Sequence, residues 1–123
     1  MAKIEPALPS PRLVGNVLKW YYGDTFSINW TITLKRDGVP IIFGEGDQIV
    51  FSFYIPNSPK CVQVFTFDNI TSNLFTLNFT SDISKKFIPG KYVYDIKYIS
   101  TAADTMEVKT IGSFNCIEVE RCH

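Results

Sequence analysis

The chain has 123 residues, 46% of them hydrophobic and 15% aromatic, which is enough apolar material for the core of one domain. Twelve basic residues balance twelve acidic ones, so no overall field attracts nucleic acid or an anionic membrane. The three cysteines have no CxxC spacing, which argues against a disulfide scaffold or a zinc site and favours reduced thiols.

Residues 1–13 are predicted to form an extended arm, because Pro6, Pro9 and Pro11 disfavour regular secondary structure. We expect this arm either to be disordered in a free monomer or to dock on a neighbouring subunit. The N-terminus lacks the apolar run of a signal peptide, and no stretch approaches the roughly 20 apolar residues of a membrane span.

The first strand is predicted over residues 17–22, where side chains alternate between two faces. Leu18 and Trp20 share the inner face, whereas Tyr21 lies on the outer one. Gly23-Asp24 then forms a turn into the next strand.

The clearest pattern in the chain is the alternation from Phe26 to Leu34, in which large apolar residues occupy every second position. A spacing of two predicts a half-buried strand, here with Trp30 inward and with Asn29 and Thr31 outward. The outer face of this strand carries no charge, so we expect it to meet another protein surface.

A hairpin is predicted at Asp37-Gly38, since both residues tolerate positive φ. The alternation returns over residues 48–55 and predicts a strand with Phe51 and Phe53 in the core. Tyr54 falls on the outer face of that strand.

A strand is predicted over residues 61–67, and its two fairly apolar faces leave open whether it is central or meets a partner. Residues 75–80 alternate again, with Leu77 inward. The only convincing helical turn is 81–87, for which Ser81 is the expected N-cap.

The period of two resumes over residues 92–98, and the inward residues are Tyr92, Tyr94, Ile96 and Tyr98. A last long strand is expected over 106–119, with a bulge at Gly112. Residues 120–123 are expected to be a frayed tail. Seven to eight strands between turns predict one antiparallel β-sandwich or barrel over residues 14–119.

No catalytic constellation is visible. The only histidine is His123, the last residue, which disfavours a Ser-His-Asp triad, a Cys-His pair or a histidine-ligated metal. Glu45 and Asp47 lie in a glycine-rich loop without the run of acidic residues that calcium needs. We therefore predict that the protein is not an enzyme and has no cofactor.

Two outward aromatic residues, Tyr21 and Tyr54, form the other candidate site. Exposed rings can bind protein or sugar, so the alternative function is a carbohydrate-binding module that recognises a cell-wall glycan. Both rings can equally pack under loops as part of the fold.

Two stretches resemble a known group of proteins: 23–32, with Trp30 at its centre, and 75–96. They are similar to small immunoglobulin-like sandwich domains of phages and prophages of Gram-positive bacteria, and the nearest family is the upper baseplate protein N-terminal domain. This resemblance implies a virion structural part that holds other virion proteins. Members of that family usually continue into longer regions, so we expect a small accessory protein.

The segment from Gly90 to Tyr94 also resembles the entry to strand F of immunoglobulin domains. There a tyrosine hydroxyl binds the backbone at the preceding corner, and Tyr92 takes that place. Tyr94 stands where antibody domains have a bridging cysteine, so packing by Trp30 is expected to replace the disulfide.

The sequence thus predicts a non-enzymatic structural or accessory protein of a phage virion, in the capsid decoration, neck, tail or baseplate. It would be made in the host bacterial cytoplasm and would bind other virion proteins or copies of itself in a symmetric assembly, but neither nucleic acid nor a membrane. The residues predicted to contact partners are Pro6, Pro9, Pro11, Tyr21, Asn29, Thr31 and Tyr54.

Overall fold

The computed structural model describes residues 11–32, 35–36, 38–40, 42–58, 60–100, 105–108 and 116–121. Within these ranges the chain forms eleven strands and one helical turn, which confirms the predicted all-β sandwich with a short helical turn. The strands are β1 (Arg12–Val14), β2 (Val17–Tyr21), β3 (Phe26–Thr31), β4 (Lys35–Arg36), β5 (Val39–Pro40), β6 (Gln48–Tyr54), β7 (Cys61–Phe67), β8 (Leu74–Phe79), β9 (Gly90–Ile99), β10 (Thr105–Val108) and β11 (Cys116–Glu120), and the helical turn is α1 (Ser81–Ser84). The strands outnumber the seven to eight predicted, because β1, β4 and β5 are short additional strands and the last strand is divided in two.

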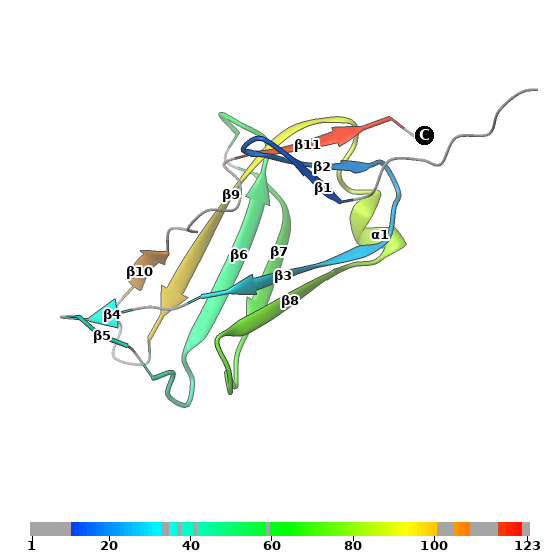
Figure 1. The fold of residues 1–123 in the computed structure, drawn as a ribbon. Helices are drawn as coiled ribbons and strands as arrows, with labels where there is room; N and C mark the ends of the chain where they lie inside the picture. The colour runs from blue at the N-terminus through cyan, green and yellow to red at the C-terminus, as the bar shows by residue number, and fades with distance from the viewer. Residues whose placement is uncertain are drawn as a thin grey trace, which may run out of the picture.

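The sandwich has one large and one small sheet (Figure 1). The large sheet has the order β1-β2-β11-β9-β6-β7, with β10 paired to β9. The small sheet is the antiparallel pair of β3 and β8, and β4 and β5 form a separate hairpin across Gly38. The strand at 61–67 is therefore at an edge of the large sheet rather than at its centre.

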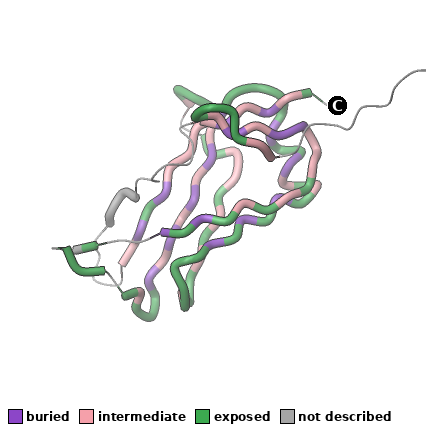
Figure 2. Tube along the Cα trace, viewed as in Figure 1, coloured by how far each residue is buried: buried purple, intermediate pink, exposed green. Residues whose placement is uncertain are grey.

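The core lies between these two sheets because the inner faces of their strands carry nearly all the large apolar side chains. In β6 every second residue is buried, and the same alternation runs along β8 (Figure 2). Of the seven predicted core residues, six are buried: Trp30, Phe51, Phe53, Leu77, Tyr92 and Ile96. Tyr94 is half-buried and packs against this cluster.

Trp30 joins the two sheets. From β3 its ring lies 5.0 Å from that of Phe51 in β6 and 5.5 Å from that of Tyr94 in β9, measured between ring centroids. This contact occupies the place that the resemblance assigned to a disulfide. A second tryptophan, Trp20, is fully buried under Phe26 and Phe79 at the other end of the core.

The corner before β9 is tied by a side chain. The hydroxyl of Tyr92 donates a hydrogen bond of 2.6 Å to the carbonyl of Ile88, as the resemblance to strand F implied. The turn α1 precedes this corner, but its N-cap is Thr80 instead of the expected Ser81. The Thr80 hydroxyl accepts from the amide of Ile83, which places the helix start one residue earlier.

Both ends of the predicted domain need correction. Residues 12–14 form β1 against β2, so a strand begins within the predicted arm. Glu120 belongs to β11 and not to a frayed tail. Pro11 is half-buried beside β1, whereas Pro6 and Pro9 lie outside the described residues.

The predicted last strand is divided between two strands that both pair with β9. β10 runs beside residues 96–99 and β11 beside residues 90–92. Gly112, the predicted bulge, lies outside the described residues. β11 also pairs with β2 in parallel, which departs from the expected antiparallel arrangement, because strands from opposite ends of the chain meet there (Figure 1).

Candidate interaction surface

The outer face of the small sheet is exposed and uncharged. From β3 it presents Ser27, Asn29 and Thr31, and from β8 it presents Leu74, Thr76 and Asn78. We call these six residues the neutral face. Ser27, Asn29 and Thr31 were predicted to lie on the outer face of β3 together with Thr33, which lies outside the described residues.

Two hydrogen bonds across the strands hold the neutral face in place. The hydroxyl of Ser27 donates to the side-chain oxygen of Asn78 over 2.7 Å. The hydroxyl of Thr76 donates to the side-chain oxygen of Asn29, also over 2.7 Å. Each bond joins directly opposite residues of the antiparallel register, so the side chains form two ordered rows.

The half of the neutral face on β8 was missed by reasoning from sequence. The alternation in residues 74–79 was visible, but it shows only which residues share a face. Which strand lies beside β8 depends on tertiary pairing, and only the structure places Thr76 next to Asn29.

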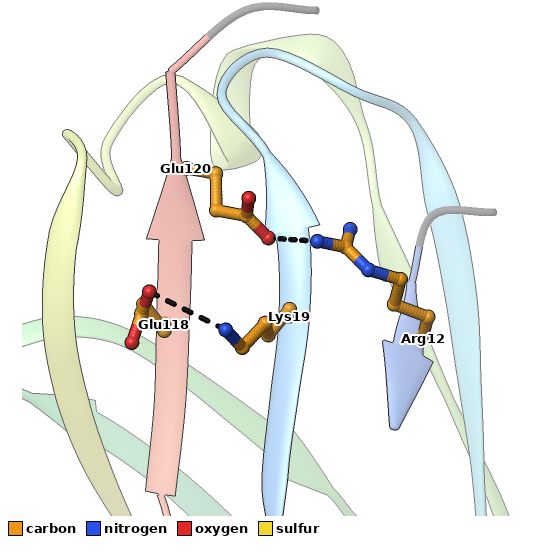
Figure 3. Close-up of polar contacts among 4 residues, drawn as sticks. All are labelled: Arg12, Lys19, Glu118 and Glu120. Carbon is orange, nitrogen blue, oxygen red and sulfur yellow. Dashed lines mark hydrogen bonds and ion pairs between the residues drawn. The ribbon is translucent and has the colours of Figure 1, made fainter. Parts of the chain in front are cut away.

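The outer face of the large sheet differs from the neutral face in charge, because charged residues of β1, β2 and β11 form ion pairs there (Figure 3). Lys19 of β2 lies 3.6 Å from Glu118 of β11. Arg12 of β1 reaches past β2 and forms an ion pair with Glu120. These pairs bind the strands of the chain ends together and leave the neutral face as the uncharged side of the sandwich.

Tyr21 does not form the exposed aromatic site predicted from its position. It is only 9% exposed, and the guanidinium of Arg12 lies 5.1 Å from the centre of its ring. The alternation did place it on the outer face of β2, but β1 covers it there. Tyr54 is half-buried on β6, and two strands separate β6 from β2 in the sheet order, so these rings form no common platform.

A shallow hollow of about 410 Å³ lies at the end of the small sheet nearest α1. Five of its seven lining residues carry a hydroxyl or an amide group, but most of the exposed lining surface is apolar. The rings of Phe26 and Phe79 stack beside it with their centroids 4.8 Å apart. The residues that line it are Thr25, Phe26, Ser27, Asn78, Phe79, Thr80 and Ser81.

Other kinds of site were sought across the described ranges. They contain no group of three or more His, Cys, Asp or Glu side chains placed to hold a metal ion. No helix within them is long and apolar enough to cross a membrane. Cys61 and Cys116 are free thiols, and Cys122 lies outside the described residues.

Comparisons with protein-family models, with curated protein sequences and with solved structures found no match to this chain.

Proposed function

We propose that this chain is a non-enzymatic structural or accessory subunit of a phage virion, which binds other particle proteins through the neutral face. The observation that carries the proposal is the absence of charge from all six exposed side chains of that face. Charged residues make up 20% of the chain, so the lack of charge is a property of this face and not of the whole chain. Protein interfaces are depleted in charged residues at their centres, and this face has that composition.

The assignment to a virion is supported by the resemblance to immunoglobulin-like phage domains. Two details of the structure agree with the immunoglobulin-like part of that resemblance: the bond from Tyr92 to Ile88 at the corner before β9, and the contact between Trp30 and Tyr94.

The proposal is tested by incorporation into particles. Asn29→Arg places a charge in the middle of the neutral face, and Asn16→Arg makes the same change at an exposed turn between β1 and β2. Mass spectrometry of purified virions should find the Asn16 variant at the wild-type level and the Asn29 variant strongly reduced. Absence of the wild-type chain from virions would refute the virion assignment, and equal incorporation of both variants would refute the role of this face.

A carbohydrate-binding module is the second candidate, and the hollow near α1 is the observation that favours it. Hydroxyl and amide groups beside an aromatic ring are the kind of groups that bind sugars. Binding on a glycan array that disappears with Ser27→Ala/Asn78→Ala would support this candidate. Loss with Tyr54→Ala alone would instead place the glycan on β6, and no binding by the wild-type chain would exclude glycan recognition.

A further inference from the structure

Within the described residues the small sheet has two unpaired long edges, one on β3 and one on β8, and the edge of β8 lies beside β7. β8 pairs with β3 on one side, and these two strands are the whole of the small sheet within the described residues. β7 lies across the core along the same margin of the sandwich: the rings of Phe65 and Phe79 are 5.2 Å apart, and those of Phe67 and Phe75 are 5.3 Å apart. We call the outer side of β8 the open edge.

The open edge has none of the features that usually prevent strand addition. Natural edge strands are protected by charges, prolines, bulges or short length. β8 has six residues, all uncharged, with no proline and no register shift against β3. β7 beside it also carries no charged residue. Backbone groups of every second residue of β8 therefore point away from β3 and are available to another strand.

We propose that the open edge pairs antiparallel with the open edge of a second copy of this chain, giving a two-fold dimer with a four-stranded sheet β3-β8-β8-β3. This inference deepens the proposed function by naming one partner of the small sheet. Directly opposite residues of an antiparallel pair share a face, so the two-fold axis passes between the two copies of one β8 residue. Axes at Thr76 and at Leu77 are equally well centred on β8, and we choose Leu77 because it sets Thr76 opposite Asn78 of the second copy.

This register repeats a pairing that the molecule already makes. Within one copy, Thr76 binds Asn29 and Ser27 binds Asn78, in each case through a hydroxyl that donates to an amide oxygen. Across the axis, Thr76 and Asn78 meet twice, and there the side-chain N–H of Asn78 donates to the hydroxyl oxygen of Thr76, whose own proton is already given to Asn29. The rows of the neutral face then continue from one copy into the next.

The charges at the two ends of the margin favour an antiparallel second copy. At the α1 end lie exposed Lys60, Lys85 and Lys86, which outnumber Asp82. The ammonium of Lys86 is 3.0 Å from the side-chain oxygen of Gln63, which fixes it beside β7. At the other end, exposed Asp68 follows β7 directly. A two-fold axis brings the basic end of each copy beside the acidic end of the other, whereas parallel pairing would place like charges together.

Sedimentation velocity of the full chain, from micromolar to millimolar concentration, tests the dimer. We expect a monomer–dimer equilibrium for the wild type. Thr76→Lys/Asn78→Lys sets lysine opposite lysine twice and should raise the dimer dissociation constant about ten-fold or more. Thr76→Asp/Asn78→Asp should do the same, and mixing these two variants should restore a dimer that contains one copy of each.

The matched control is Ser27→Lys/Asn29→Lys. It removes the same two hydrogen bonds and adds the same charge to the same face, but on β3, one strand away from the axis. This control should dimerise like the wild type, and thermal unfolding should show that all variants are folded. A wild-type chain that stays monomeric at every concentration, a mixture that does not pair, or a control as monomeric as the β8 variant would each overturn the proposal.

Failure of this inference is distinguishable from failure of the proposed function. A chain that dimerises through β8 but is missing from virions keeps the dimer and refutes the virion role. A chain that enters virions but never dimerises refutes the dimer alone.

Discussion

The ring of Trp30 in β3 and the ring of Tyr94 in β9 lie 5.5 Å apart, and they connect the small sheet to the middle of the large one. Trp30 is 4% exposed and also contacts Phe51, so its removal would leave a large cavity between the sheets. Trp30 thus holds the small sheet to the large one through ring contacts with both β6 and β9.

Trp30→Ala is expected to lower the free energy of unfolding by about 3–5 kcal/mol, as other truncations of large core aromatics do. Urea unfolding followed by circular dichroism measures this loss. Leu13→Ala, at a half-exposed apolar residue of β1, is the control and should change stability little. A loss below about 1 kcal/mol for Trp30→Ala would show that Trp30 does not fill the core.

Tyr92→Phe should remove the bond to Ile88 at a cost of about 0.5–1.5 kcal/mol at neutral pH. Burial also raises the pKa of the Tyr92 hydroxyl above its ordinary value of 10.0, so the folded chain holds this proton to higher pH than the unfolded chain. The stability from Tyr92 is then fully present below pH 10 and is lost as pH rises through the folded pKa.

Thermal unfolding at a series of alkaline pH values checks this sign. The wild type should lose stability more steeply than Tyr92→Phe above the ordinary tyrosine pKa, so the gap between the two narrows there. A gap that widens or stays constant with pH would contradict the assigned direction of the shift.

Tyr98→Phe tests the buried carboxylate of Asp47, which is only 4% exposed. The hydroxyl of Tyr98 and the amide of Gly44 each donate to the same oxygen of Asp47 over 2.8 Å. Loss of one donor to a buried acceptor is expected to cost about 1–3 kcal/mol. The cost should nearly vanish when Asp47→Ala has already removed the acceptor oxygen, and a double-mutant cycle on the unfolding free energies measures that coupling.

A pair of truncations tests where the folded domain begins. Deletion of residues 1–10 leaves β1 in place and should hardly change the melting temperature. Deletion of residues 1–14 removes Arg12, uncovers Tyr21 and breaks the ion pair to Glu120, so it should melt at a lower temperature. Equal melting temperatures would mean that β1 contributes nothing to stability. If Pro6 and Pro9 contact a partner, as predicted, the shorter deletion should also lower incorporation into virions.

The sequence predicts this fold well where side chains alternate strictly, as in residues 48–54 and 74–79. A period of two shows which side chains share a face, and that was enough to place Phe51, Phe53 and Leu77 in the core. The corner at Tyr92 was found from its resemblance to strand F, which adds a specific hydrogen bond to the pattern.

Contacts between distant strands could not be predicted from the same pattern. Alternation put Tyr21 on an outer face, but it gives no sign that Arg12 from β1 covers the ring. The pairing of β3 with β8 was also hidden, so only the half of the neutral face on β3, Ser27, Asn29 and Thr31, was predicted to contact a partner. Which strands pair depends on the tertiary structure, and the alternation of side chains within one strand carries no information about its neighbours.

The parallel pairing of β2 with β11 has a consequence for how the chain folds. Val17 of β2 lies opposite Cys116 of β11, so these two strands are about 100 residues apart in the sequence and can pair only after residues 116–120 have been made. Closing such a long loop lowers the entropy of the chain before the contacts between β2 and β11 can stabilise it, so we expect folding to be slow. During synthesis, one edge of β2 stays unpaired until residues 116–120 have been made, so we expect the nascent chain to be prone to aggregation until then.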